Sequence, residues 1–199
     1  YEDMLINMLE HRRNDEFWRF SNIIQYVDEH KDLPVFMIGG WYDLFSSSTT
    51  GTYMALKKAI RGPVHLIMGP WIHGMQGRSN GQVDFGPDAV VDMTPIRRAW
   101  YDRWLKGMEA GFGTQVPFRT PVRMFVMGTG DGHKTEDGKL YHGGYWRDAP
   151  DYPLPEAQPT KYYLYGDGRL ATAAPAEKAS STTYDFDPRN PVPTIGGCT

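Results

Sequence analysis

The sequence predicts an α/β fold with a parallel sheet, followed by an all-β region. Two continuous apolar runs, residues 35–39 and 64–68, are each bounded by proline and glycine, as is typical of strands buried on both faces. A helical pattern separates the runs, which indicates a βαβ unit with a right-handed crossover. No helical pattern follows Gly113.

Composition excludes several classes of protein. The chain has 199 residues, enough for one large domain or two small ones, and a formal net charge of -3. That balance gives no reason to expect a nucleic acid or an anionic membrane as partner. No apolar run approaches the roughly 18 residues of a membrane span. Cys198 is the single cysteine, so an intrachain disulfide is impossible.

The first 34 residues are predicted to be helix and loop. Residues 1–10 have the apolar pattern of a short helix, with Met4, Leu5 and Met8 on one face. Asn14 is a suitable N-cap for a second helix, since acidic residues follow it in the first turn. Pro34 ends this region.

The crossover helix is predicted between Ser46 and Ile60. The serines and threonines at 46–50 are suited to helix caps, and Tyr53, Leu56 and Ile60 repeat at helical spacing. Gly62 and Pro63 form a stop signal before the second strand.

Residues 69–93 are glycine-rich and are predicted to be irregular. Thr94 and Pro95 then predict the start of a helix, as a cap followed by proline at the first helical position. Ile96 and Trp100 share one face of that helix, and Gly107 ends it.

The remaining residues are predicted to form strands and turns. Strands are expected at 121–127 and 160–165, separated by a turn-rich stretch and several prolines. We place a domain boundary near residues 113–117, which divides the chain into 1–113 and 114–199. The second part has too few strands for a closed sandwich.

Asp43 and His73 stand out as a candidate catalytic pair. Each follows the end of a predicted strand, where functional groups gather in open α/β sheets. One helix and one strand separate them, so hydrogen bonding between them is feasible. The carboxylate would then hold the imidazole in one tautomer while it moves a proton. Taken singly, Asp43 also fits a helix cap and His73 an ordinary loop histidine.

The nucleophile of such a site is harder to find. Ser79 lies in a literal G-x-S-x-G sequence at residues 77–81, but no predicted strand precedes it and no helix follows. Ser46, Ser47 and Ser48 are interpreted as caps, and Cys198 has no obvious base. The serine is therefore expected outside this chain.

Aromatic residues flank both candidates and are suited to a substrate pocket or to packing above the sheet. These residues are Trp41, Tyr42, Phe45 and Trp71. His133 and His142 fit no standard metal-ligand spacing, and His65 is expected in the core or at a strand edge. The sequence thus predicts no metal and no cofactor.

Several stretches resemble the cocaine-esterase-like and X-Pro dipeptidyl-peptidase-like serine hydrolases. That group includes α-amino-acid ester hydrolases and glutaryl-cephalosporin acylases. The similar stretches are residues 39–45, 69–73, 99–107, 122–128 and 187–197, so the resemblance extends along nearly the whole chain.

The resemblance implies that Asp43 is the triad acid and His73 the general base. It implies an α/β-hydrolase domain up to about Gly113, present as its C-terminal part, and a partial jelly-roll-like β domain after it. The serine elbow, oxyanion hole and helical cap would lie upstream, so the chain is expected to be truncated at both ends. The missing N-terminal part of the same enzyme would be its partner.

The preferred interpretation is part of a serine hydrolase that cleaves a small ester, amide or acyl-peptide substrate through an acyl-enzyme. A self-contained Asp43, His73 and Ser79 set is the competing enzyme hypothesis. A β-sandwich binding or assembly module is the non-enzyme hypothesis. The sequence leaves the compartment open (cytoplasmic, periplasmic or secreted) and does not decide whether the protein is a homo-oligomer.

Overall fold

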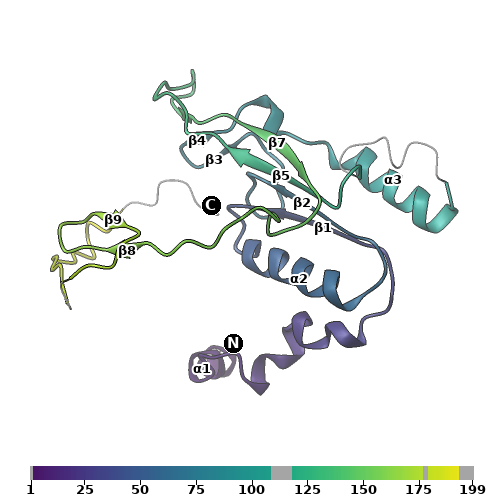
Figure 1. Cartoon of the computed structure of the whole chain (residues 1–199), viewed down its shortest axis with the longest axis horizontal. Helices are drawn as coiled ribbons and strands as arrows, with labels where there is room; N and C mark the ends of the chain where they lie inside the picture. Colours follow the sequence, from purple (N-terminus) through teal and green to yellow (C-terminus); the bar gives the residue numbers. More distant parts are fainter. Residues whose placement is uncertain (1, 109–117, 177–178, 193–199) are drawn as a thin grey trace. The chain divides into compact units, whose positions relative to one another are not determined.

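The computed structural model describes residues 2–108, 118–176 and 179–192 (Figure 1). The chain divides into two compact units, one running to Tyr152 and the other from Pro153 to Thr194. Each unit is considered by itself below.

The first unit is built on the predicted βαβ arrangement. Strand β1 (Val35–Gly40) and strand β2 (Val64–Gly69) are parallel, in a register that runs from Val35 opposite Val64 to Gly40 opposite Gly69. Helix α2 (Ser46–Ala59) connects them. The predicted parallel pair and its crossover helix are therefore confirmed.

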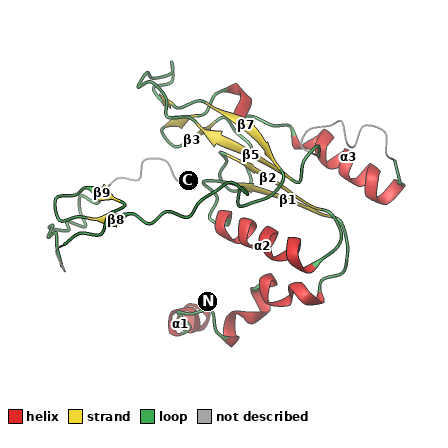
Figure 2. Ribbon diagram, in the orientation of Figure 1, coloured by secondary structure: helices red, strands yellow, loops and turns green. Residues whose placement is uncertain are grey.

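Two helices cover opposite faces of this sheet (Figure 2). Gly39 faces α2, because a Cβ atom there would lie 3.0 Å from the Thr49 methyl group. Phe36 points to the other face, where its ring lies 5.4 Å from that of Trp100 on helix α3 (Met93–Lys106). Alternation along a strand requires this division, since Phe36 and Gly39 differ by an odd number of positions.

The prediction of burial on both faces is correct for β2 and wrong for most of β1. In β2, Leu66, Ile67 and Met68 are at most 1% exposed, whereas Val35 to Ile38 of β1 are only half-buried. The difference arises because β1 is an edge strand, with β2 on one side and no described strand on the other.

The sheet continues beyond β2. Strand β5 (Val122–Met127) pairs parallel with β2, and strand β7 (Gly144–Ala149) pairs antiparallel with β5. The order is β1-β2-β5-β7. The strand predicted at 121–127 is confirmed, but it belongs to the same sheet as β1 and β2. The residues of the predicted boundary up to 117 lie outside the described residues.

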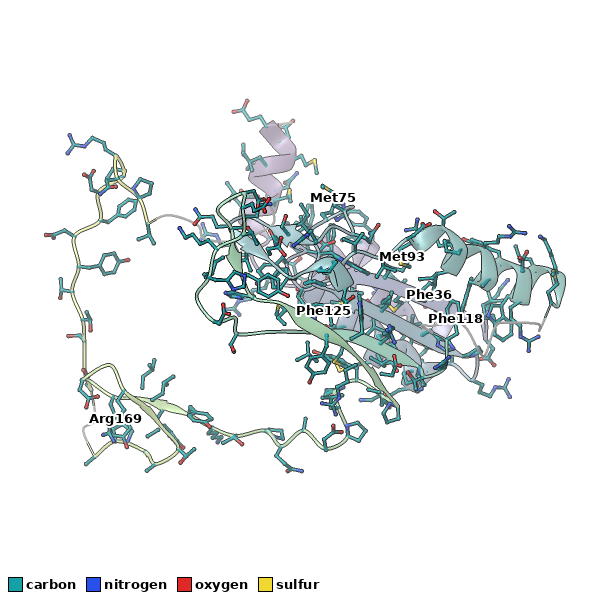
Figure 3. All side chains as sticks on the ribbon, turned by 90° about the horizontal axis from the view of Figure 1, so that it is seen from above. Phe36, Met75, Met93, Phe118, Phe125 and Arg169 are labelled. Atoms are coloured by element: carbon teal, nitrogen blue, oxygen red, sulfur yellow. The ribbon has the colours of Figure 1, made fainter. Side chains whose placement is uncertain are left out.

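Helix α3 has the predicted position with a different cap. The helix begins at Met93, and the backbone N–H of Thr94 donates to Asp92 Oδ1 over 2.9 Å. Asp92, rather than Thr94, is thus the N-cap residue. Figure 3 shows Met93, Phe36 and Phe118 gathered where the helix meets the sheet, in a cluster that also contains Trp100.

The N-terminal helices are short and exposed. They comprise α1 (Glu2–Glu10) and two 3-10 helices, η1 (Glu16–Ser21) and η2 (Ile23–Glu29). Asp15 caps η1 through the N–H of Phe17, so the prediction of Asn14 as the cap is wrong. None of the described helices is long and apolar enough to cross a membrane.

The predicted irregular stretch 69–93 contains some regular structure. Strands β3 (Ser79–Asn80) and β4 (Val83–Asp84) pair antiparallel, and β6 (Leu140–Tyr141) joins β4 in a small second sheet. A 3-10 helix, η3 (Pro87–Ala89), follows. These elements are too short to leave a periodic pattern in the sequence.

The second unit contains one small hairpin among its described residues. Strand β8 (Tyr163–Leu164) pairs antiparallel with β9 (Leu170–Ala171). The strand expected at 160–165 is therefore present in part. The jelly-roll-like fold implied by the resemblance stays a prediction.

Candidate functional site

The carboxyl ends of β1 and β2 stay together beyond the strands. The N–H of Trp41 donates to the carbonyl of Gly69 over 2.8 Å, and the N–H of Tyr42 donates to that of Trp71 over 3.1 Å. Gly40 permits this approach, because a Cβ atom there would lie 2.2 Å from the Trp71 carbonyl oxygen. The two segments that carry Asp43 and His73 are thus held side by side.

Asp43 occupies the turn between β1 and α2. Its carboxylate accepts a hydrogen bond at Oδ1 from the N–H of Phe45 over 2.8 Å, just before the helix begins. Its side chain is only 13% exposed. One carboxylate oxygen thus stabilises the turn ahead of α2, but Phe45 rather than Asp43 is the N-cap residue of the helix.

The serines at the start of α2 do not have the predicted cap role. Ser46 is the first residue of the helix, and Phe45 precedes it without a side-chain cap hydrogen bond. The N–H of Ser46 instead donates to the backbone carbonyl of Asp43 over 3.0 Å. Ser47 and Ser48 belong to the first turn.

His73 stands at the tip of a tight turn after β2. An antiparallel bridge joins Ile72 to Met75, and Gly74 between them has φ +74°, a left-handed conformation that glycine adopts without strain. The His73 side chain is 60% exposed. This turn is not predicted above, although the glycine directly after the histidine is a usable signal for it.

The two candidates are in contact. His73 Nδ1 lies 3.1 Å from Asp43 Oδ2. An ionised carboxylate can only accept, so Nδ1 must donate, and this assigns the neutral imidazole a lone pair at Nε2. That atom has no hydrogen-bond partner within the described part of the chain. A neutral imidazole so oriented can accept a proton from a hydroxyl group.

Of the four aromatic candidates, Trp71 is buried in the core, and Trp41 and Tyr42 are partly buried. Trp71 is 2% exposed and its indole N–H donates to the Ala89 carbonyl over 2.7 Å. Trp41 donates to the Phe125 carbonyl over 2.8 Å. Tyr42 packs on Phe85 at a centroid distance of 5.6 Å, and burial raises the pKa of its phenol.

Phe45 is the aromatic residue that contacts the candidate pair. Its ring lies edge-on to His73 at a centroid distance of 5.4 Å and is about half exposed. Leu44, the residue after Asp43, and Met75, which is labelled in Figure 3, are both 60% exposed. His73 therefore has an apolar and accessible neighbour in Phe45.

Ser79 has different partners. Its hydroxyl accepts a hydrogen bond from Lys139 Nζ over 2.5 Å, and it lies on strand β3. No hydrogen bond joins it to His73 in the ranges that the structure describes. The self-contained triad considered from the sequence gains no geometric support.

The other histidines lie in different environments. His133 bonds to Asp131 and stacks on Tyr141 at 4.8 Å. His65 is half-buried on β2, as expected, and its Nδ1 lies 3.2 Å from the Thr120 carbonyl. Burial lowers the pKa of its imidazole, and the positive charge of Lys57 lowers it further, against the opposing effect of the Thr120 contact.

A family model for X-Pro dipeptidyl-peptidases of the S15 family matches residues 2–75, a range that contains both Asp43 and His73. The chain is also similar to the cocaine esterase of Rhodococcus sp. (strain MB1 Bresler), with 30% identity over 201 aligned positions. That alignment covers 96% of this chain and 31% of the esterase, so the chain spans about a third of the length of this relative.

A solved structure shows a similar fold. It is a CocE/NonD family hydrolase from Staphylococcus aureus, with a TM-score of 0.51 and 16% identity. The match covers 85% of this chain and 26% of the hydrolase. The chain is thus similar in sequence to X-Pro dipeptidyl-peptidases of the S15 family and to a cocaine esterase, and it shares a fold with the solved hydrolase.

Proposed function

We propose that Asp43 and His73 are the acid and the general base of a serine hydrolase that cleaves an ester or amide bond. The observation that carries this proposal is the 3.1 Å contact between Asp43 Oδ2 and His73 Nδ1 at the carboxyl ends of two parallel strands. This contact leaves Nε2 accessible on a side chain that is 60% exposed.

In the proposed mechanism, His73 Nε2 takes the proton of a serine hydroxyl as the oxygen attacks the substrate carbonyl. The proton then passes to the leaving group as the tetrahedral intermediate collapses to an acyl-enzyme. His73 next takes a proton from water as the water oxygen attacks the acyl carbon. It returns that proton to the serine oxygen as the bond between acyl group and serine breaks, which releases the acid and regenerates the serine. Asp43 stays ionised and stabilises the imidazolium that forms at each proton transfer.

The serine is proposed to lie in polypeptide beyond these 199 residues. Ser79 is bonded to Lys139, and the serines at 46–48 form the first turn of α2, directly after the turn that holds Asp43. The length of the Rhodococcus relative is compatible with a nucleophile carried elsewhere, since the alignment leaves most of it unmatched.

The proposed substrate is a small ester, amide or acyl-peptide. The relative is named as an esterase of cocaine and the family model as a dipeptidyl-peptidase, so both bond types occur among the similar proteins. Of the four aromatic candidates, we retain Phe45 as the residue that faces substrate. Trp41, Tyr42 and Trp71 are proposed to support the site through packing and backbone hydrogen bonds.

The first test is replacement of His73 in the longest natural protein that contains this chain. His73→Ala is expected to lower kcat on activated esters by about 10⁴-fold or more, because the serine loses its base. His11→Ala is the matched control, since His11 also bonds through Nδ1 to an aspartate, at 2.8 Å, outside the site. Near-normal turnover of His73→Ala would refute the proposal.

A further inference from the structure

A second polar site lies on the small sheet of β3, β4 and β6. Ser79 pairs with Asp84 and Asp84 pairs with Tyr141, so these three side chains share one face of the sheet. They line a cavity of about 550 Å³ together with Arg78 and the loop at 133–137. This volume is in the range of small-molecule sites.

Arg78 is held in one orientation within this cavity. Its Nε and Nη2 atoms bond to Asp84 at 2.8 and 2.9 Å, and the side chain of Asp84 is only 4% exposed. Asp84 Oδ1 also accepts the N–H of Gly86 over 2.7 Å. The carboxylate is thus buried and fully engaged, and it fixes the plane of the guanidinium.

The fixed guanidinium keeps a free edge. Asp84 occupies the edge formed by Nε and Nη2, whereas Nη1 has no hydrogen-bond partner among the residues that the structure describes. Arg78 lines the cavity and its side chain is 48% exposed. The remaining edge of the guanidinium presents one N–H of Nη1 and the second N–H of Nη2 in parallel, which matches the two oxygens of a carboxylate.

Hydroxyl groups supply further donors on the same face. Lys139 Nζ donates to Ser79 Oγ over 2.5 Å, so the proton of the Ser79 hydroxyl is available to another acceptor. Tyr141 adds a phenol to the lining. The guanidinium of Arg78 and the hydroxyls of Ser79 and Tyr141 are therefore three donors available to one anionic group.

Acidic side chains at the same cavity limit the charge of the ligand. Glu136 and Asp137 belong to the lining, and the hydrogen bond from Thr135 lowers the pKa of Asp137, which keeps it ionised. Two negative charges beside the site disfavour a dianion such as phosphate more than a single carboxylate.

We propose that this cavity binds a small monocarboxylate through the Nη1 edge of Arg78, with Ser79 and Tyr141 as additional donors. The site is separate from the Asp43 and His73 pair, and the proposal does not depend on the proposed function.

The test is calorimetric titration of the protein with propionate, with its neutral isostere propionamide, and with inorganic phosphate. Propionate is expected to bind saturably, and propionamide and phosphate are expected to bind at least about tenfold more weakly. Equal binding of propionamide, stronger binding of phosphate, or no saturable binding of propionate would each overturn the proposal. The dipeptide Ala-Ala and its C-terminal amide then distinguish a peptide terminus from a free acid.

Substitutions test whether propionate binds at Arg78 and Tyr141. Arg78→Lys keeps the charge that Asp84 needs but removes the bidentate edge, and it should weaken propionate binding about tenfold. Tyr141→Phe should weaken it less. Arg61→Lys is the matched control, because Arg61 also pairs with an aspartate, Asp32, on an exposed surface. Unchanged binding by Arg78→Lys with an unaltered circular dichroism spectrum would contradict the assignment.

Discussion

At the scale of single residues, Asp43 performs two tasks with its two carboxylate oxygens. Oδ1 accepts the N–H of Phe45 ahead of α2, and Oδ2 accepts from His73. The structural and catalytic interpretations of this aspartate therefore do not compete. Both depend on the turn that links β1 to α2, and a substitution can change the contact with His73 while it keeps the contact with Phe45.

Asp43→Asn should separate these tasks. The amide oxygen can still accept from Phe45, so stability should change little, but the amide N–H₂ would face His73 Nδ1 and favour the tautomer protonated at Nε2. That imidazole cannot accept the serine proton, and kcat should fall on the order of 10³- to 10⁴-fold. Steady-state kinetics and thermal melts of the natural enzyme measure both effects.

Asp43→Ala provides the comparison. It removes the hydrogen bond from the Phe45 N–H as well as the histidine contact, so it should additionally lower the free energy of unfolding by about 1 kcal/mol. An Asp43→Asn enzyme with unchanged kcat would show that the carboxylate does not set the tautomer of His73.

At the scale of elements, the approach of β1 to the segment after β2 depends on the absence of a side chain. A Cβ atom at Gly40 would lie 2.2 Å from the Trp71 carbonyl oxygen, and that carbonyl accepts the N–H of Tyr42. Backbone atoms cannot yield as a flexible side chain can. This one position therefore governs how Asp43 and His73 meet.

Gly40→Ala should destabilise the first unit by about 1–3 kcal/mol, because the two segments must separate. Gly51→Ala is the matched control within α2, where the new Cβ atom would lie 3.5 Å from the Ile24 methyl group, an ordinary contact. That change should stabilise the helix by about 0.5–1 kcal/mol. Urea unfolding measures both, and equal effects would contradict the steric argument.

His65 connects strand β2 to the aromatic cluster under α3. Its ring lies 5.8 Å from that of Trp100 and 5.6 Å from that of Phe118. Burial lowers its folded-state pKa below the unfolded value of about 6.5, so the unfolded chain binds the proton more readily. The stability that depends on neutral His65 is fully present above that pH and is lost as the pH falls toward the folded-state pKa.

In the wild type, the free energy of unfolding should decrease as the pH falls below about 6.5. His65→Asn should make this decrease smaller, even if it lowers stability at pH 8. Urea titrations of the wild type and the variant at several pH values measure the two slopes. His11→Asn, at an exposed histidine, is the control. Parallel pH profiles for His65→Asn and the wild type would contradict this account.

At the scale of the whole molecule, the sheet extends through residues that sequence reasoning assigns to a second domain. Strand β5 pairs with β2 and covers its second edge, and β7 completes the sheet. The compact unit built on this sheet continues to Tyr152. The choice between a boundary at 113 and one at 152 is open to direct measurement.

A chain of residues 1–152 should unfold cooperatively, whereas residues 1–113 should not. The shorter chain lacks β5 and β7, so the second edge of β2 is exposed. It also lacks the side chains of Val122, Met124 and Phe125, which are buried in the core. Thermal melts by circular dichroism measure the difference. A sharp transition for 1–113 at the temperature of 1–152 would favour the earlier boundary.

The sequence by itself determined the βαβ unit and the proximity of Asp43 and His73 at one edge of the sheet. Long apolar runs bounded by proline and glycine report strand burial directly, and strand ends of a parallel sheet share one edge. Such signals lie within short segments, so they can be interpreted without knowing which distant residues those segments contact.

Only the tertiary structure decided which side chains face the site and where the sheet ends. Trp41, Tyr42, Phe45 and Trp71 look alike as aromatic neighbours of the pair, yet only Phe45 contacts His73. Nothing in the sequence of strand β5 indicates that it pairs with β2. Orientation and strand pairing depend on contacts between residues far apart in the chain, and those contacts form only when the whole sheet packs.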